Sequence, residues 1–150
     1  MKKLIFSFIG FLMAAIAVAQ VQNPVKWNYT SKKISDKTYE VHITAMIDAG
    51  WHVYTLDHKA DIGVATSVKF AKNPLATPTG TLQAKGKPVS LKDPSTGEMV
   101  KFYNNTIDLV QMYTLKTAVP TKITGTLDYM TCNDERCLPP ASKPFTVALQ

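Results

Sequence analysis

Two cysteines, Cys132 and Cys137, are the residues of this chain whose type and spacing best suit covalent chemistry. They are the only cysteines in the chain, four residues separate them, and Pro139 and Pro140 follow closely. A bond between them would close a loop of six residues, for which chain entropy predicts about 2 kcal/mol, near the low end for disulfides. Stability alone is a weak reason for this pair, so exchange of the bond with other thiols is the chemistry to consider.

The residues between the cysteines bear on such an exchange. The thiolate attacks a disulfide, and a nearby positive charge lowers the pKa of a thiol while a negative charge raises it. Arg136 is the nearest cation to Cys137, and Asp134 and Glu135 oppose it. We expect a moderately acidic Cys137 thiol, which suits a reductant because a thiolate whose pKa lies near ambient pH attacks well.

The N-terminal end of the chain indicates the cellular compartment of the protein. Lys2 and Lys3 precede an apolar run over residues 4–18, and Ala17-Val18-Ala19 fits a cleavage site. This pattern predicts a signal peptide over residues 1–19, and its apolar run is shorter than the roughly 20 residues of a membrane-spanning helix. We therefore expect a periplasmic or otherwise exported protein, soluble after cleavage, in an oxidising space where disulfides persist.

Residues 20–150 fall within the usual size of one domain. The formal net charge of +6 becomes +4 when Lys2 and Lys3 are removed, and the other lysines are scattered. We expect these lysines to form a solvated surface and predict no binding of nucleic acid. No Ser/His/Asp pattern or nucleotide-binding motif occurs, and we expect no small-molecule cofactor.

Apolar and polar residues alternate along much of the chain, which is typical of half-buried strands. The clearest case runs from Tyr39 to Ile47, and Asp48-Ala49-Gly50 then predicts a turn into a strand over residues 51–56 as a hairpin. Seven further strands are predicted, over residues 25–30, 66–71, 79–84, 99–103, 106–115, 122–130 and 143–149. Ser90 to Glu98 is predicted to be a long exposed loop. Short strands separated by turns, with no helical stripe, indicate an all-β fold, a single immunoglobulin-like antiparallel β-sandwich.

In this arrangement the cysteine segment lies between the last two strands. Residues opposed across antiparallel strands can approach disulfide distance. Pro139 and Pro140 cannot donate ladder hydrogen bonds, so we expect a stiff exit from Cys137 that presents the sulfurs rather than burying them.

Three segments resemble a known family, the periplasmic N-terminal domain of the thiol:disulfide interchange protein DsbD. They are the Cys-x4-Cys-Leu-Pro-Pro segment after Asp128-Tyr129-Met130, the strand Gly50-Trp51-His52-Val53-Tyr54, and the Asp93-Pro94 loop that leads to Val100-Lys101-Phe102-Tyr103. The resemblance implies an immunoglobulin-like sandwich with a redox-active cysteine pair. It also implies electron transfer from a membrane-embedded donor to thioredoxin-like periplasmic proteins, which serve disulfide isomerisation and cytochrome c maturation.

By the same resemblance Cys137 forms the mixed disulfide with a partner and Cys132 resolves it. Tyr54, with His52 on the same strand face, would lie beside the pair. Family members cover the disulfide with an aromatic just before a glycine, where this chain has Thr96 before Gly97. We therefore expect Phe102 or Tyr103 to shield the pair, or a less protected pair. Because the chain ends soon after the sandwich, we expect the membrane-embedded donor to be a separate protein.

Other functions are compatible with the residues alone. The disulfide could be a structural clip in a β-sandwich that only binds a partner. Three methionines and the thiols could suit a soft copper ion, although methionines on strands are usually core residues; they are Met99, Met112 and Met130. Two cysteines four residues apart lack the second ligand pair of a zinc ribbon, so we expect no metal. His52 and Tyr54 could equally be ordinary residues of a strand edge.

Overall fold

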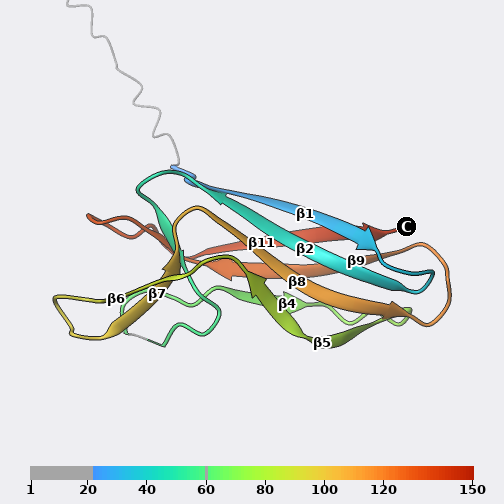
Figure 1. Ribbon diagram of the computed structural model, residues 1–150. Helices are drawn as coiled ribbons and strands as arrows, with labels where there is room; N and C mark the ends of the chain where they lie inside the picture. Colours follow the sequence, from blue (N-terminus) through green and yellow to red (C-terminus); the bar gives the residue numbers. More distant parts are fainter. Residues whose placement is uncertain (1–21, 60) are drawn as a thin grey trace, which may run out of the picture.

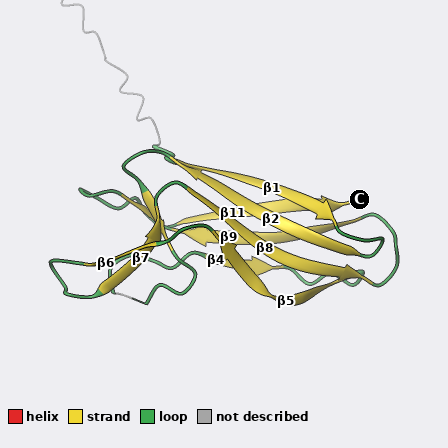
Figure 2. Cartoon of the chain, in the orientation of Figure 1, coloured by secondary structure: helices red, strands yellow, loops and turns green. Residues whose placement is uncertain are grey.

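The computed structural model describes residues 22–59 and 61–150, and every helix or strand assigned in these ranges is a β-strand (Figure 1, Figure 2). The signal peptide predicted for residues 1–19 lies outside the described residues. The strands are β1 (Val25–Lys33), β2 (Thr38–Ile47), β3 (His52–Tyr54), β4 (Ser67–Phe70), β5 (Ala76–Lys85), β6 (Val89–Lys92), β7 (Met99–Tyr103), β8 (Thr106–Leu115), β9 (Thr121–Tyr129), β10 (Thr131–Cys132) and β11 (Ala141–Leu149). A helix that could cross a membrane is absent from the ranges just given.

The strands form three antiparallel sheets, and two of them face each other. Their strand orders are β1-β2-β8-β5, β11-β9-β4 and β10-β3-β7-β6. Aromatic rings join the first two sheets: Tyr29 of β1 stacks on Phe145 of β11 at 5.2 Å between centroids, and Phe70 of β4 lies 5.7 Å from Tyr113 of β8. The prediction of an immunoglobulin-like antiparallel β-sandwich is confirmed.

β2 shows how alternating apolar and polar residues form a strand with one buried face. Every second side chain from Tyr39 to Ile47 is buried, and the side chains between them are partly or fully exposed. Burying a large apolar side chain contributes about 1.5–3 kcal/mol. The alternation predicted for this segment is therefore confirmed.

The hairpin predicted between residues 39–47 and 51–56 is wrong, because the chain changes sheets after β2. β2 pairs with β1 and β8, whereas β3 pairs with β7 and β10. The Asp48-Ala49-Gly50 turn does form, with Trp51 N donating to Asp48 O at 3.1 Å and with a φ of 81° at Gly50. Turn residues reverse the chain locally, but the strand that pairs next depends on the tertiary packing.

The long exposed loop predicted for residues 90–98 is also wrong in its first part. Val89–Lys92 forms β6, which pairs with β7 so that Leu91 lies opposite Val100. Figure 1 shows β6 and β7 at one end of the sandwich, away from the C-terminus. Four residues are too few for a clear period-two pattern, so this strand is defined by its partner.

β4 and β11 flank β9 and come very close to it at Gly125. Gly125 pairs with Phe70 on one side and Phe145 on the other. A Cβ added there would lie 2.6 Å from the backbone oxygen of Lys69 and 2.6 Å from the ring of Phe145. Only glycine allows this approach.

We predict that Gly125→Ala lowers the free energy of unfolding by about 1–3 kcal/mol, because it overpacks this contact. Urea denaturation of the oxidised protein measures the effect. Thr124→Ala, at an exposed position of the same strand, is the matched control and should cost less. A Gly125→Ala protein as stable as the parent would contradict the close packing.

Candidate functional site

Cys132 and Cys137 are joined by a disulfide at the edge of the β10-β3-β7-β6 sheet. Leu138 N donates to Thr131 O at 2.8 Å, and Asn133 N donates to Arg136 O at 2.9 Å. The cysteines occupy the opposed pair between these bonds, with Cα atoms 4.0 Å apart. Opposed residues without mutual hydrogen bonds are the pairs whose side chains lie closest, so the hairpin brings the sulfurs together.

The tip of this hairpin is a turn organised by Asn133. Its side-chain oxygen accepts hydrogen bonds from Glu135 N at 3.0 Å and from Arg136 N at 2.7 Å. Asparagine favours turns through such local bonds. Asp134, Glu135 and Arg136 are exposed as a result, and the Arg136 guanidinium donates to the Gln22 side chain at 2.5 Å.

The two cysteines differ sharply in exposure. Cys132 is only 1% exposed because β10 pairs it with His52 of β3. Cys137, on the outer arm of the hairpin, is exposed. The expectation that both sulfurs would be presented is therefore wrong for Cys132, and any reagent in solution reaches the Cys137 side first.

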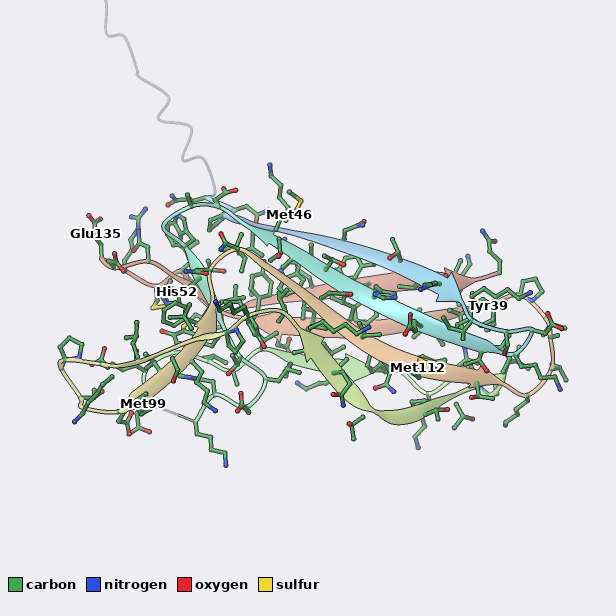
Figure 3. All side chains as sticks on the ribbon, viewed as in Figure 1. Tyr39, Met46, His52, Met99, Met112 and Glu135 are labelled. Carbon is green, nitrogen blue, oxygen red and sulfur yellow. A yellow bond between two sulfur atoms is a disulfide. The ribbon has the colours of Figure 1, made fainter. Side chains whose placement is uncertain are left out.

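The disulfide lies in a groove between the cysteine hairpin and the third sheet with its loops. Four of the five supporting residues named from the sequence line it: His52, Tyr54, Phe102 and Arg136. Ile62, Leu91, Asp93, Pro94, Val100 and residues 132–137 complete the lining. Figure 3 shows His52 and Glu135 at the same end of the molecule, where the β6 and β7 strands also lie.

Tyr103, the fifth supporting residue, does not line the groove. It follows Phe102 on β7 and therefore points to the opposite face of the strand. It is buried in the core, where its ring would lie 3.1 Å from a Cβ added at Gly86. Of the two aromatics expected to shield the pair, the structure thus brings Phe102 to the groove.

Aromatic rings form the wall behind the disulfide. The His52 ring centroid lies 4.3 Å from that of Phe102 and 5.5 Å from that of Tyr54, to which it is nearly perpendicular. Burial lowers the pKa of His52, and Asp134 opposes this effect. Burial, followed by the nearby Asp93 charge, raises the pKa of Tyr54. Both side chains are therefore predominantly uncharged at neutral pH.

The loop over residues 93–98 carries a fixed negative charge at the groove. The Asp93 carboxylate accepts hydrogen bonds from Ser95 N and Thr96 N, each at 2.9 Å, and from both hydroxyls. The Ser95 hydroxyl, followed by the Thr96 backbone, lowers the pKa of Asp93. With Asp134 and Glu135 against Arg136, the groove lining is acidic in a chain whose net charge is positive.

Sequence reasoning missed three apolar residues of the lining, namely Ile62, Leu91 and Val100. Val100 had a usable signal because it alternates with Phe102 on a predicted strand. Leu91 falls in the segment predicted to be a loop, and Ile62 in a segment without a periodic pattern. Their position at the groove follows from the packing of separate elements.

Metal ligands do not gather at this site. In the described part of the chain, no three His, Cys, Asp or Glu side chains form a group that could hold a metal ion. The methionines considered for copper lie apart in the fold: Met99 is on β7, Met112 on β8, and Met130 between β9 and β10. Figure 3 shows Met99 and Met112 at separate places.

Comparison with known proteins places this geometry in context. The model of the family described as "Thiol:disulfide interchange protein DsbD, N-terminal" matches residues 19–149. Among curated proteins, no sequence matches the chain.

Two solved structures are similar to the chain. The N-terminal periplasmic domain of ScsB from Proteus mirabilis has a TM-score of 0.53 and 13% sequence identity, over 83% of this chain and 44% of that chain. The N-terminal domain of Neisseria meningitidis DsbD in the reduced form has a TM-score of 0.50 and 18% identity, over 81% of this chain and 84% of that chain. These similarities show the fold, and the chain spans less than half of the ScsB chain.

The lowered pKa of His52 predicts a pH dependence of stability. The unfolded chain binds a proton at His52 as the pH falls through about 6.5, whereas the folded protein does so only at lower pH. Stability is therefore lost from about pH 6.5 downward, until the folded pKa is passed. His52→Gln should lose less free energy of unfolding than the parent between about pH 7.5 and about pH 5.5.

Asp134→Asn is the companion variant in this measurement. Because Asp134 raises the pKa of His52, its removal should steepen the loss on acidification. Urea denaturation at the two pH values measures both effects. Equal losses in the parent and in His52→Gln would show that His52 is not the group that titrates.

Proposed function

The chain belongs to the family of DsbD N-terminal domains, and from this premise we propose that it is an exported thiol-disulfide exchange protein using Cys132 and Cys137. It would take two electrons from a separate membrane-embedded donor and pass them to thioredoxin-like periplasmic proteins, for disulfide reduction and cytochrome c maturation. The observation that carries the proposal is the unequal exposure of the bonded pair, with Cys137 exposed at a groove and Cys132 buried behind it.

The exchange proceeds in two steps. In the reduced protein the Cys137 thiolate attacks one sulfur of the partner's disulfide, so a mixed disulfide forms and the partner's other sulfur leaves as a thiolate that takes up a proton. Cys132 then loses its proton and attacks the Cys137 sulfur, which restores the Cys132–Cys137 bond and releases the partner's second thiol. Two electrons and two protons reach the partner in total.

The residues around the groove suit a selective reductant. Arg136 favours a thiolate at Cys137, while Asp93, Asp134 and Glu135 oppose it, which is consistent with a thiol of moderate acidity. His52, Tyr54 and Phe102 give the groove an uncharged aromatic wall, which limits access from that side. A free Cys137 would then react slowly with small oxidants and faster with a partner that binds the groove.

The first test distinguishes the two cysteines. Reduced Cys132→Ser protein is mixed with a thioredoxin that has one active-site cysteine, activated as a disulfide with thionitrobenzoate. Because Cys137 is exposed and lacks its resolving partner, we expect a stable covalent complex on a non-reducing gel. Cys137→Ser, which keeps the buried Cys132, should form it at least about tenfold more slowly. Equal rates for the two variants would contradict the assignment.

The second test separates exchange from a structural clip. Equilibration of the native protein with a glutathione or thioredoxin redox series measures the reduction potential of the pair. An exchanging pair should have a potential above about −300 mV, with the protein folded in both states by circular dichroism. A potential far below this value, or unfolding on reduction, would favour a β-sandwich that carries the bond only as a clip.

A further inference from the structure

We propose that His58 is a positioning residue of the exchange site: together with Ile62 and Gly63 it holds the Tyr54 ring against the groove that contains the disulfide. We call His58, Ile62 and Gly63 the Tyr54 cradle. The biological meaning of this inference rests on the proposed function, whereas its geometry and its test concern only the disulfide and the chain itself.

His58 meets Tyr54 ring against ring. The two centroids lie 4.3 Å apart with an interplanar angle of 35°, and His58 is only 8% exposed. Its Nε2 lies 2.6 Å from the Ile62 carbonyl oxygen. A carbonyl can only accept, so Nε2 carries the hydrogen and donates it. This bond sets the orientation of the imidazole and ties it to the chain that passes over Tyr54.

The second ring nitrogen of His58, Nδ1, also bears on why a histidine occupies this position. Its Nδ1 is buried and has no hydrogen-bond partner. Buried polar atoms without partners are uncommon in native proteins and call for a specific explanation. The position keeps an imidazole in spite of this unpaired nitrogen, and the ring contact with Tyr54 and the Nε2 bond to Ile62 are the interactions that the imidazole provides.

Gly63, another residue of the Tyr54 cradle, packs closely against the same ring. Its φ is +85°, and a Cβ added there would lie 2.1 Å from Cε2 of Tyr54. The position therefore requires glycine for its backbone and for its close approach to the ring. Thr66 adds a bond from its hydroxyl to the Tyr54 carbonyl oxygen at 2.6 Å, which holds the backbone of Tyr54.

Residues next to the Tyr54 cradle are bonded to the loop over residues 93–98 and to β7. The Asp61 amide donates to the Glu98 carboxylate at 2.9 Å, and the Lys101 ammonium pairs with Asp57 at 2.9 Å. Tyr54 itself lies opposite Phe102 on β7 and lines the groove with both cysteines. The ring is thus held between the cradle and the disulfide groove, and its freedom to swing depends on His58.

Loss of the cradle should therefore open the disulfide to small thiols. In the oxidised native protein, a dithiothreitol thiolate attacks the Cys137 sulfur and Cys132 leaves as a thiolate. The second dithiothreitol thiol then closes its own disulfide and releases Cys137 as a thiol. With His58→Ala we expect the rate constant of this reduction to rise about threefold or more, because the Tyr54 ring, which forms part of the groove wall, is then free to move away from the disulfide.

A double-mutant cycle tests whether His58 acts through Tyr54. Tyr54→Ala alone should raise the rate constant, and adding His58→Ala to it should change the rate constant by less than about twofold. His58→Gln, which keeps a donor for Ile62 but lacks the ring, gives a second cycle if His58→Ala does not fold. Circular dichroism checks the fold, and alkylation of freed thiols follows the reduction.

His42→Ala is the matched control. His42 is a partly buried histidine of β2 whose Nδ1 bonds to Asp108 at 2.8 Å, outside the groove lining. Its replacement should lower stability but leave the rate constant of reduction unchanged. An unchanged rate in the His58 variant, or the same acceleration with and without Tyr54, would overturn the proposal. Failure of the parent protein to exchange with thioredoxin would overturn only the proposed function.

Discussion

The pairing of β10 with β3 is the constraint on which the candidate site depends. Two residue pairs, Thr131 with Val53 and Cys132 with His52, place the inner cysteine in register against the third sheet. This pairing buries Cys132 and leaves Cys137 on the outer arm of the hairpin. A short strand thus makes a symmetric bond chemically asymmetric, because only one of its two sulfurs is readily accessible to a partner.

The side chains that form the wall of the groove around this disulfide are mostly uncharged and packed against one another. His52 and Tyr54 are held in their neutral forms by burial, and Phe102 packs against the His52 ring. The charged groups lie on the loops, where hydrogen bonds within its own turn lower the pKa of Asp93 and keep it ionised. The third sheet supplies the aromatic wall of the groove, and the loops supply its charged groups.

Much of the framework could be predicted from the sequence because a period of two directly encodes half-buried strands. Residues 39–47, 99–103 and 106–115 were predicted within one residue of the observed bounds. Which strands pair with one another could not be predicted in the same way. Gly50 indicated a turn but not the change of sheet that follows, and Val89–Lys92 became a strand only because β7 lies beside it.

The sequence by itself determined where covalent chemistry is possible: two cysteines lie at close spacing, with a predicted strand before them and prolines after them. It also named His52, Tyr54, Phe102 and Arg136, since alternation and family resemblance are local properties of the chain. Only the tertiary structure decided which cysteine is exposed, which of two adjacent aromatics lines the groove, and that His58, in an irregular segment, packs against Tyr54. The exposure of the cysteines depends on the pairing of β10 with β3, and the groove on contacts between separate elements, and a local sequence pattern does not record the free energy of such contacts.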